Sequence, residues 1–175
     1  MVNKNPLLTS WNTPYEIAPF DKILDCHFSE ALEIAMEYEL QEIQEISENS
    51  DPPTFENTIH ALLNSGKLLE RVLSVFYTLV SADSNTQREK LMTEFSPKLS
   101  SHSSKITSNE KLFSRIHELF KQIDSLNLLP EEKRLLEKIH QDFVRAGAAL
   151  NNQSKERLKD IKKQLSILGT KFSQN

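Results

Sequence analysis

Hydrophobic residues recur at steps of three and four along most of the chain, which is the spacing of one face of an α-helix. The first such stretch runs from His27 to about Ile46. Its apolar positions are Phe28, Leu32, Ala35, Met36, Leu40, Ile43 and Ile46. Glutamates occupy the opposite side of the same stretch, so the pattern predicts an amphipathic helix.

A polar turn should follow this helix, because residues 47–51 are polar and Pro52 and Pro53 come directly after them. Thr54 is then expected to be the N-cap of a second helix, with Phe55, Ile59, Leu62 and Leu63 facing inward. Gly66 stands where this helix should stop or bend.

Residues 68–82 are apolar on more than one side, which predicts the most buried helix of the chain. Ser84 and Gln87 have the spacing of a capping box and should open the next helix. Pro97 is expected to kink or break that helix, because proline lacks the backbone N–H that the helix needs.

The C-terminal half repeats the helical spacing twice. A helix is predicted over residues 112–123, and Pro130 suits the first position of another. One apolar stripe then continues from Leu135 to Phe172, with a bend or break expected between Gly147 and Asn152.

The first 24 residues differ from the rest, because they hold Pro6, Pro14 and Pro19 among apolar residues. We expect an extended arm that packs along the helical body. The sequence therefore predicts an all-α fold, a multi-helix antiparallel array, with an N-terminal arm (1–24) and a helical domain (25–175).

Composition supports a globular protein, since hydrophobic residues make up 38% of the 175 residues and charged residues 26%. The net charge of −4 disfavours nucleic acid as a partner. The single cysteine, Cys26, excludes an internal disulfide and fits a reducing compartment. Neither a secretory signal nor a membrane-spanning run occurs in the sequence, so we expect a cytoplasmic protein with no membrane partner.

Three near-matches to catalytic or metal motifs fall short. Cys26 and His27 are adjacent, and adjacent helical residues point about 100° apart. His117-Glu118 begins a zinc-protease pattern, but Lys121 stands where the second histidine must be.

Glu137 and His140 have the spacing used in di-iron bundles, yet no second copy of the pair exists, so a surface ion pair is expected. We therefore assign no catalytic, cofactor-binding or metal-binding residue to this chain.

Short stretches spread over the whole sequence nevertheless carry a resemblance. They are Asn5–Leu8, Trp11–Pro14, Pro19–Ile23, His27-Phe28, Pro53–Ile59, Ser65-Gly66, Leu99–His102, Leu135–Glu137 and Phe172–Asn175. In this order they resemble the N-terminal helical region of the thimet-oligopeptidase family of zinc peptidases, which includes the bacterial peptidyl-dipeptidases (dipeptidyl carboxypeptidases) and oligopeptidase A.

The resemblance implies a helical piece that forms one wall of a deep channel, which admits short peptides and excludes folded proteins. The family's zinc motif lies in a later part of much longer chains. It follows that no zinc ligand or general base can be carried onto any residue here. Zinc and short peptides would belong to the full-length parent, whose catalytic part would be the partner of this chain.

The end of the sequence leads to the same expectation, because the apolar stripe reaches Phe172 without a capping glycine or proline. The stripe residues Leu158, Ile161, Leu165, Leu168 and Phe172 should then be exposed and promote self-association. Two alternatives stay open: a freestanding helical protein-interaction module, and an enzyme whose site the sequence does not reveal.

Overall fold

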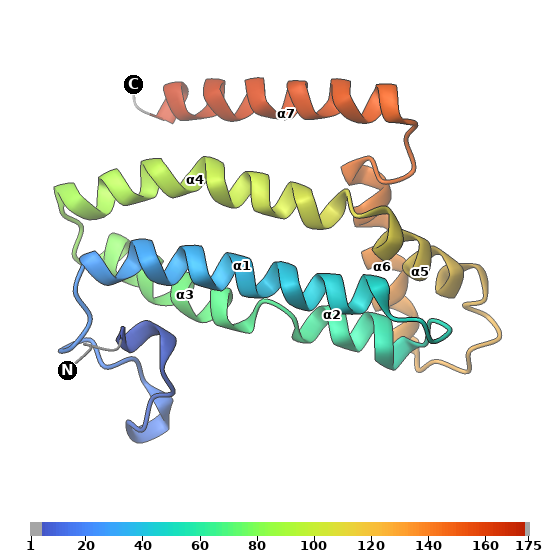
Figure 1. Cartoon of the computed structure of the whole chain (residues 1–175), viewed down its shortest axis with the longest axis horizontal. Helices are drawn as coiled ribbons and strands as arrows, with labels where there is room; N and C mark the ends of the chain where they lie inside the picture. The colour runs from blue at the N-terminus through green and yellow to red at the C-terminus, as the bar shows by residue number, and fades with distance from the viewer. Residues whose placement is uncertain (1–4, 174–175) are drawn as a thin grey trace. The chain divides into compact units, whose positions relative to one another are not determined.

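Every regular element among residues 5–173, the part of the chain that this computed structural model describes, is helical (Figure 1). The longer helices are α1 (Cys26–Glu48), α3 (Lys67–Ala82), α4 (Thr86–Thr107), α5 (Glu110–Lys121), α6 (Pro130–Ala146) and α7 (Asn152–Ser173). The shorter elements are η1 (Pro6–Leu8), η2 (Pro14–Glu16), the π-helical turn η3 (Phe55–His60) and α2 (Ala61–Asn64). The predicted all-α class is confirmed. Some side chains of α7, including that of Phe172, lie outside the described residues.

The chain divides into two compact units. The first unit comprises Met1–Glu45 and Leu63–His102, and the second comprises Ile46–Leu62 and Ser103–Asn175. None of the described helices combines the length and apolarity that a membrane span requires.

The core of the first unit lies among α1, α3 and α4, which run in alternating directions (Figure 1). Phe28 of α1 and Phe76 of α3 meet edge to face at its centre, with ring centroids 5.1 Å apart. The buried residues around them are Leu7, Ala18, Ile23, Ala31, Leu32, Ala35, Leu69, Val72, Val75 and Phe95. Each large side chain buried in this way stabilises the fold by about 1.5–3 kcal/mol.

The N-terminal segment is anchored to this core by one apolar side chain and by hydrogen bonds. Leu7 is fully buried, and its carbonyl accepts a hydrogen bond of 3.0 Å from Nη2 of Arg71 on α3. Nδ2 of Asn5 donates to the carbonyl of His27 at 2.8 Å and to Glu30 at 2.9 Å. These bonds tie the N-terminal segment to α1 and α3.

Two half-buried glutamates of α1 bond to α4 and to the start of α3. Glu39 on α1 bonds Nε2 of His102 on α4 at 2.7 Å, and His102 is 6% exposed. Gly66, just before α3, has a left-handed backbone (φ +71°), and its N–H donates to Glu42 at 2.8 Å. A Cβ on Gly66 would lie 2.4 Å from the Glu39 carboxylate, so only glycine fits here.

The second unit is built on α5 and α6, which pack against each other, with η3 against α5. Its buried residues come from all three elements: Ile59, Leu112, Ile116, Leu119, Leu136 and Phe143. Gly147 ends α6 in a left-handed conformation (φ +100°), and Leu158 of α7 lies over it. Lys155 bonds Glu110 at 2.6 Å, which joins the first turns of α7 and α5.

Several local predictions are confirmed. The Thr54 side chain accepts the N–H of Asn57 and forms a capping box with it, although η3 is a π-helical turn. Pro130 stands in the first turn of α6, and the chain breaks between α6 and α7 at Gly147.

Three predictions need correction. The side chain of Asn85, rather than that of Ser84, accepts the first N–H groups of α4. The break that was one expectation at Pro97 does not occur, since α4 continues from Thr86 to Thr107. The kink, which was the other expectation, stays a prediction. The third concerns α3, in which four of 16 residues are buried against four of 12 in α5, so α3 is not the most buried helix. Half of its apolar arc, namely Leu68, Leu73, Leu79 and Val80, is only half-buried against the core.

The left-handed backbone at Gly66 gives a direct test of this architecture. We expect Gly66→Ala to lower the free energy of unfolding by about 1–2 kcal/mol from the backbone alone, with a further loss as Glu39 is displaced. Urea unfolding would measure the change. Gly169→Ala is the matched control, because a Cβ there meets nothing within 4 Å. It should stabilise α7 by up to about 1 kcal/mol. Equal effects of the two substitutions would contradict the role assigned to Gly66.

Candidate functional site

The most concentrated polar cluster of the second unit surrounds Arg115 on α5. This side chain is 8% exposed, and Nη1 donates to the carbonyls of Asn49 at 2.8 Å and Asp51 at 3.0 Å. Nη2 donates to Oδ1 of Asn57 at 2.9 Å. The buried Nε has no partner within the described part of the chain. Arg115 therefore fastens the turn after α1, and the start of η3, onto α5.

Asn57 completes the same cluster from the other side. Its Oδ1 also accepts the N–H of Thr54 at 2.8 Å, and its Nδ2 donates to the carbonyl of Pro52 at 3.0 Å. Two acceptors of Arg115 and two partners of Asn57 are backbone groups of a proline-containing turn. The cluster thus connects this turn to α5.

A second cluster consists of aromatic rings between α5 and α6. Nδ1 of His117 and Nε2 of His140 lie 2.9 Å apart in a hydrogen bond. Phe120 stacks on His140 with ring centroids 3.9 Å apart and planes 3° apart. Phe113 stacks against both imidazoles and against Phe143.

Burial lowers the pKa of His140, and the charge of a protonated His117 would lower it further. This imidazole is therefore neutral near pH 7. It also lines a cavity of about 530 Å³ together with Phe120, Glu137 and Val144. Lys133 and Arg134 line the same cavity, and each is bonded to a carboxylate: Lys133 to Asp124 and Arg134 to Glu137.

These contacts bear on two of the motifs noted in the sequence, Glu137 with His140 and His117 with Glu118. Glu137 bonds Arg134 at 3.0 Å, so the expected ion pair between Glu137 and His140 is replaced by another partner for each residue. His117 faces His140 across the helix interface, while Glu118 and Lys121 are exposed.

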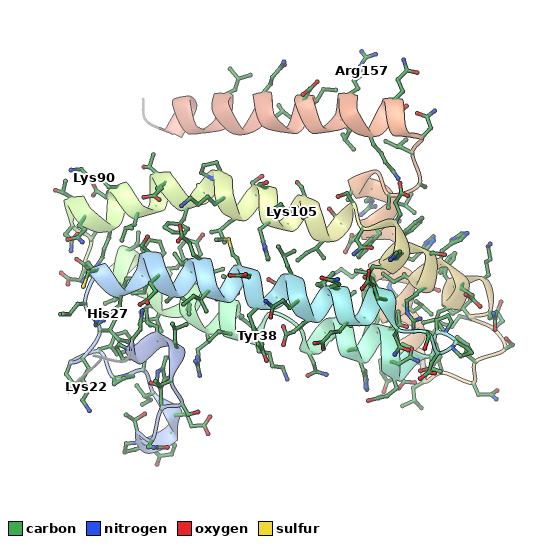
Figure 2. The ribbon with its side chains drawn as sticks, in the orientation of Figure 1. Lys22, His27, Tyr38, Lys90, Lys105 and Arg157 are labelled. Carbon is green, nitrogen blue, oxygen red and sulfur yellow. The ribbon has the colours of Figure 1, made fainter. Side chains whose placement is uncertain are left out.

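Cys26 and His27 do not form a nucleophile–base pair. His27 lies at the start of α1 (Figure 2), where its Nδ1 accepts the N–H of Leu24 at 3.0 Å. The Cys26 side chain is exposed. The imidazole nitrogen that could serve as a base is thus committed to the backbone.

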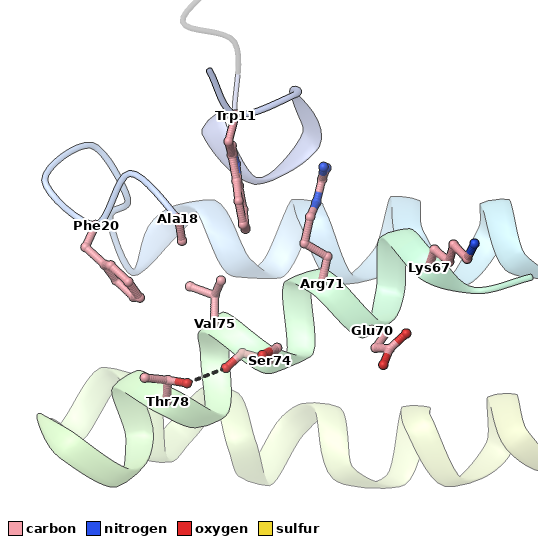
Figure 3. Close-up of a pocket in the computed structure, with 9 residues that line it drawn as sticks. All are labelled: Trp11, Ala18, Phe20, Lys67, Glu70, Arg71, Ser74, Val75 and Thr78. Carbon is pink, nitrogen blue, oxygen red and sulfur yellow. Dashed lines mark hydrogen bonds between the residues drawn. The ribbon is translucent and has the colours of Figure 1, made fainter. Parts of the chain in front are cut away.

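A shallow cavity of about 410 Å³ lies between the N-terminal segment and α3 in the first unit (Figure 3). Trp11 and Phe20 line it on one side and Val75 lies at its base. The guanidinium of Arg71 stacks on Trp11, 4.9 Å from the ring centroid. The Thr78 hydroxyl donates to the backbone carbonyl of Ser74 at 2.7 Å. The charged side chains of Lys67 and Glu70 also line this cavity.

No group of three or more His, Cys, Asp or Glu side chains in the described residues could hold a metal ion. The two bonded imidazoles do not fit zinc either. Their centroids are 5.2 Å apart and the bonded nitrogens 2.9 Å apart, so the two nitrogens point directly at each other. A chelated ion needs lone pairs that converge beside the two rings.

The apolar stripe of α7 is covered only at its start. Leu158 packs over Gly147, whereas Ile161, Leu165 and Leu168 are 43%, 62% and 60% exposed. The last member of the predicted stripe, Phe172, has a side chain outside the described residues. Three large apolar side chains at spacing i, i+4 and i+7 form an uncovered helix face.

The chain is similar in sequence to known bacterial peptidases. The chain is 38% identical over 173 residues to the dipeptidyl carboxypeptidase of Salmonella typhimurium, covering 99% of this chain and 25% of that protein. It is 37% identical over 174 residues to the dipeptidyl carboxypeptidase of Escherichia coli, covering 99% and 26%. Oligopeptidase A of Escherichia coli is 27% identical over 171 residues. No family model matches the chain.

The chain matches the N-terminal part of peptidases of the thimet-oligopeptidase family. It spans about a quarter of the length of the curated relatives it matches. The resemblance carried by the short sequence stretches is thereby confirmed.

Sequence reasoning missed two of these clusters. Nothing in the pattern paired Arg115 with the turn at 49–53, because the bonds join segments that are far apart in sequence. The imidazole pair had a signal: His140 stands four residues after Leu136 and three before Phe143, both buried on α6. A histidine on the buried stripe of a helix needs a polar partner inside the protein.

The Arg115 cluster generates the second prediction. Arg115→Leu removes three part-buried hydrogen bonds, those to the carbonyls of Asn49 and Asp51 and to Oδ1 of Asn57, and we expect the free energy of unfolding to fall by about 2–4 kcal/mol. The matched control is Arg134→Leu, which removes a 77% exposed guanidinium bonded to Glu137 on the same helix. That change should cost about 0.5 kcal/mol or less. Chemical denaturation would measure the free energy of unfolding of both variants. Similar losses for the two would mean that water replaces the hydrogen bonds of the Arg115 side chain, and would contradict the role assigned to it.

Proposed function

We propose that this chain is the non-catalytic N-terminal helical domain of a cytosolic zinc metallopeptidase that acts on short peptides, as a peptidyl-dipeptidase or an oligopeptidase. The observation that carries the proposal is the match of 99% of the chain to a quarter of dipeptidyl carboxypeptidase at 38% identity. Zinc and the catalytic residues would reside in the rest of the parent protein.

Within the parent, the domain would form part of the wall of the substrate channel. Two features support this role. The helices of each unit are held together by buried polar bonds and by apolar cores, which favours a stiff wall. The described residues also offer cavities lined by aromatic and charged side chains but no reactive pair, which suits contact with peptides rather than chemistry on them.

The catalytic part of the parent would be the main partner of this chain, and the exposed face of α7 is a surface it could cover. Each large apolar side chain left in water forgoes about 1.5–3 kcal/mol of burial. Ile161, Leu165 and Leu168 together therefore favour contact with another apolar surface.

A chimera tests the proposed function. The matching quarter of Escherichia coli dipeptidyl carboxypeptidase would be replaced by this chain, and hydrolysis of a fluorogenic peptide would be measured. We expect the chimera to hydrolyse the peptide and the same protein without this quarter to be inactive. The chain alone should contain no stoichiometric zinc and should not exceed the buffer rate. A folded chimera without activity, or hydrolysis by the chain alone, would contradict the proposal.

A freestanding helical interaction module is the second candidate, and the uncovered α7 face is the observation that favours it. The two candidate functions predict different results for the chimera. A module would bind a partner without restoring any peptidase, whereas the domain of a peptidase should restore activity in the chimera.

We further propose that the isolated chain self-associates through the α7 stripe, and this can be tested by substitution. Leu165→Glu with Leu168→Glu places two carboxylates on the exposed face, and we expect the dimer dissociation constant to rise at least about tenfold. Sedimentation at several concentrations would measure it.

The matched control for self-association is Ile34→Glu with Tyr38→Glu, which changes two exposed apolar side chains on α1. It should leave the dissociation constant unchanged. A strictly monomeric wild-type chain would show that α7 does not mediate self-association.

A further inference from the structure

The bond between His117 and His140 can take up protons in two distinct steps. In the neutral pair, one ring carries an N–H at the shared position and the other ring accepts it, across 2.9 Å. Each ring has a second nitrogen that points away from the bond. A first added proton can therefore go to an outer nitrogen and leave the N–H···N bond in place, strengthened by the charge.

A second added proton has no such position. Both rings would then be imidazolium ions with N–H groups at every nitrogen. Because the two inner nitrogens lie nearly on the line between ring centroids 5.2 Å apart, their two N–H groups would point at each other. The bond would be replaced by a contact between two cations, which the interface can relieve only by separating the rings.

Separation of the two imidazoles would also disturb the phenylalanine rings packed between α5 and α6. Phe120 lies parallel to His140 at 3.9 Å, and Phe113 stacks on both imidazoles. Rotation of either imidazole away from its partner breaks these stacks, which lie between α5 and α6. The same two helices make the most extensive contact between elements in the second unit.

We propose that this imidazole pair makes the α5–α6 interface acid-sensitive, retaining its bond with one added proton and losing it with the second. The proposal does not depend on the proposed function, because it concerns a contact within the chain alone.

Two cations near the pair are bonded to carboxylates. Lys133 is bonded to Asp124, and Arg134 to Glu137, along the cavity that His140 lines. On α5, Glu118 and Lys121 are exposed beside His117, as are Lys138 and Asp142 beside His140 on α6.

On η3, which packs against α5, Glu56 bonds His60 at 2.8 Å. Glu137 stands one turn before His140 on α6, and its carboxylate is bonded to Arg134.

The direction of the pH effect follows from the pKa of His140, which burial lowers from its ordinary value of about 6.5. The unfolded chain therefore binds a proton at this residue at a higher pH than the folded chain does. Stability is fully present above the unfolded value and is lost as the pH falls below it toward the folded value.

The test replaces both imidazoles by rings that cannot titrate. His117→Phe with His140→Phe keeps the aromatic stack and removes the proton-binding groups. Thermal unfolding and hydrogen exchange of α5 and α6 peptides, corrected for intrinsic exchange rates, would be followed from about pH 7.5 to about pH 5. We expect the wild-type melting temperature to fall by at least about 3 °C more than that of the double variant. Exchange of α5 and α6 should accelerate with acid in the wild type only.

His27→Asn is the matched control, because it removes an imidazole of the first unit and keeps an acceptor for the N–H of Leu24. It should show the wild-type acid response in α5 and α6. NMR titration of the imidazole carbons gives an independent measure, and two separate steps are expected for the pair. The same acid response in the wild type and the double variant would overturn the proposal, as would a single step at the ordinary value for both rings.

Discussion

The second unit depends on one buried guanidinium. The two prolines after α1 prevent the helix from continuing, so the carbonyls of Asn49 and Asp51 have no helical donor and must be satisfied in another way. Arg115 supplies both donors from α5 and adds a bond to Asn57. The position of α5 against η3 follows from these bonds, and α6, α7 and the imidazole pair are then built on α5.

The first unit solves the same problem with different residues. Its N-terminal segment is too rich in proline to form a long helix, and side-chain hydrogen bonds anchor it instead: Asn5 of the segment bonds the carbonyl of His27 on α1, and Arg71 of α3 bonds the carbonyl of Leu7. Trp11 Nε1 donates to the carbonyl of Pro6 at 2.8 Å. In both units, side-chain hydrogen bonds position the segments that lack helical periodicity.

The sequence could predict the helices and most of their ends, because apolar spacing and capping are local properties. Thr54, Pro130 and Gly147 act where the pattern placed them. The continuity of α4 through Pro97 could not be read locally, since tertiary packing compensates for a lost backbone bond; Phe95 beside it is 1% exposed. The candidate site was less predictable, because a bond such as His117–His140 joins two helices and depends on their register.

The stretches that carry the resemblance to peptidases contain many of the residues that make these bonds. Asn5, Trp11, Asn57, Gly66 and His102 each form a buried or backbone-directed hydrogen bond described above. At these positions the stretches that carry the resemblance consist of residues that close turns and join helices. Residues of this kind determine the shape of the chain. Under the function proposed above, the chain would therefore contribute a surface to a peptidase, and the reaction would come from residues in the rest of the parent protein.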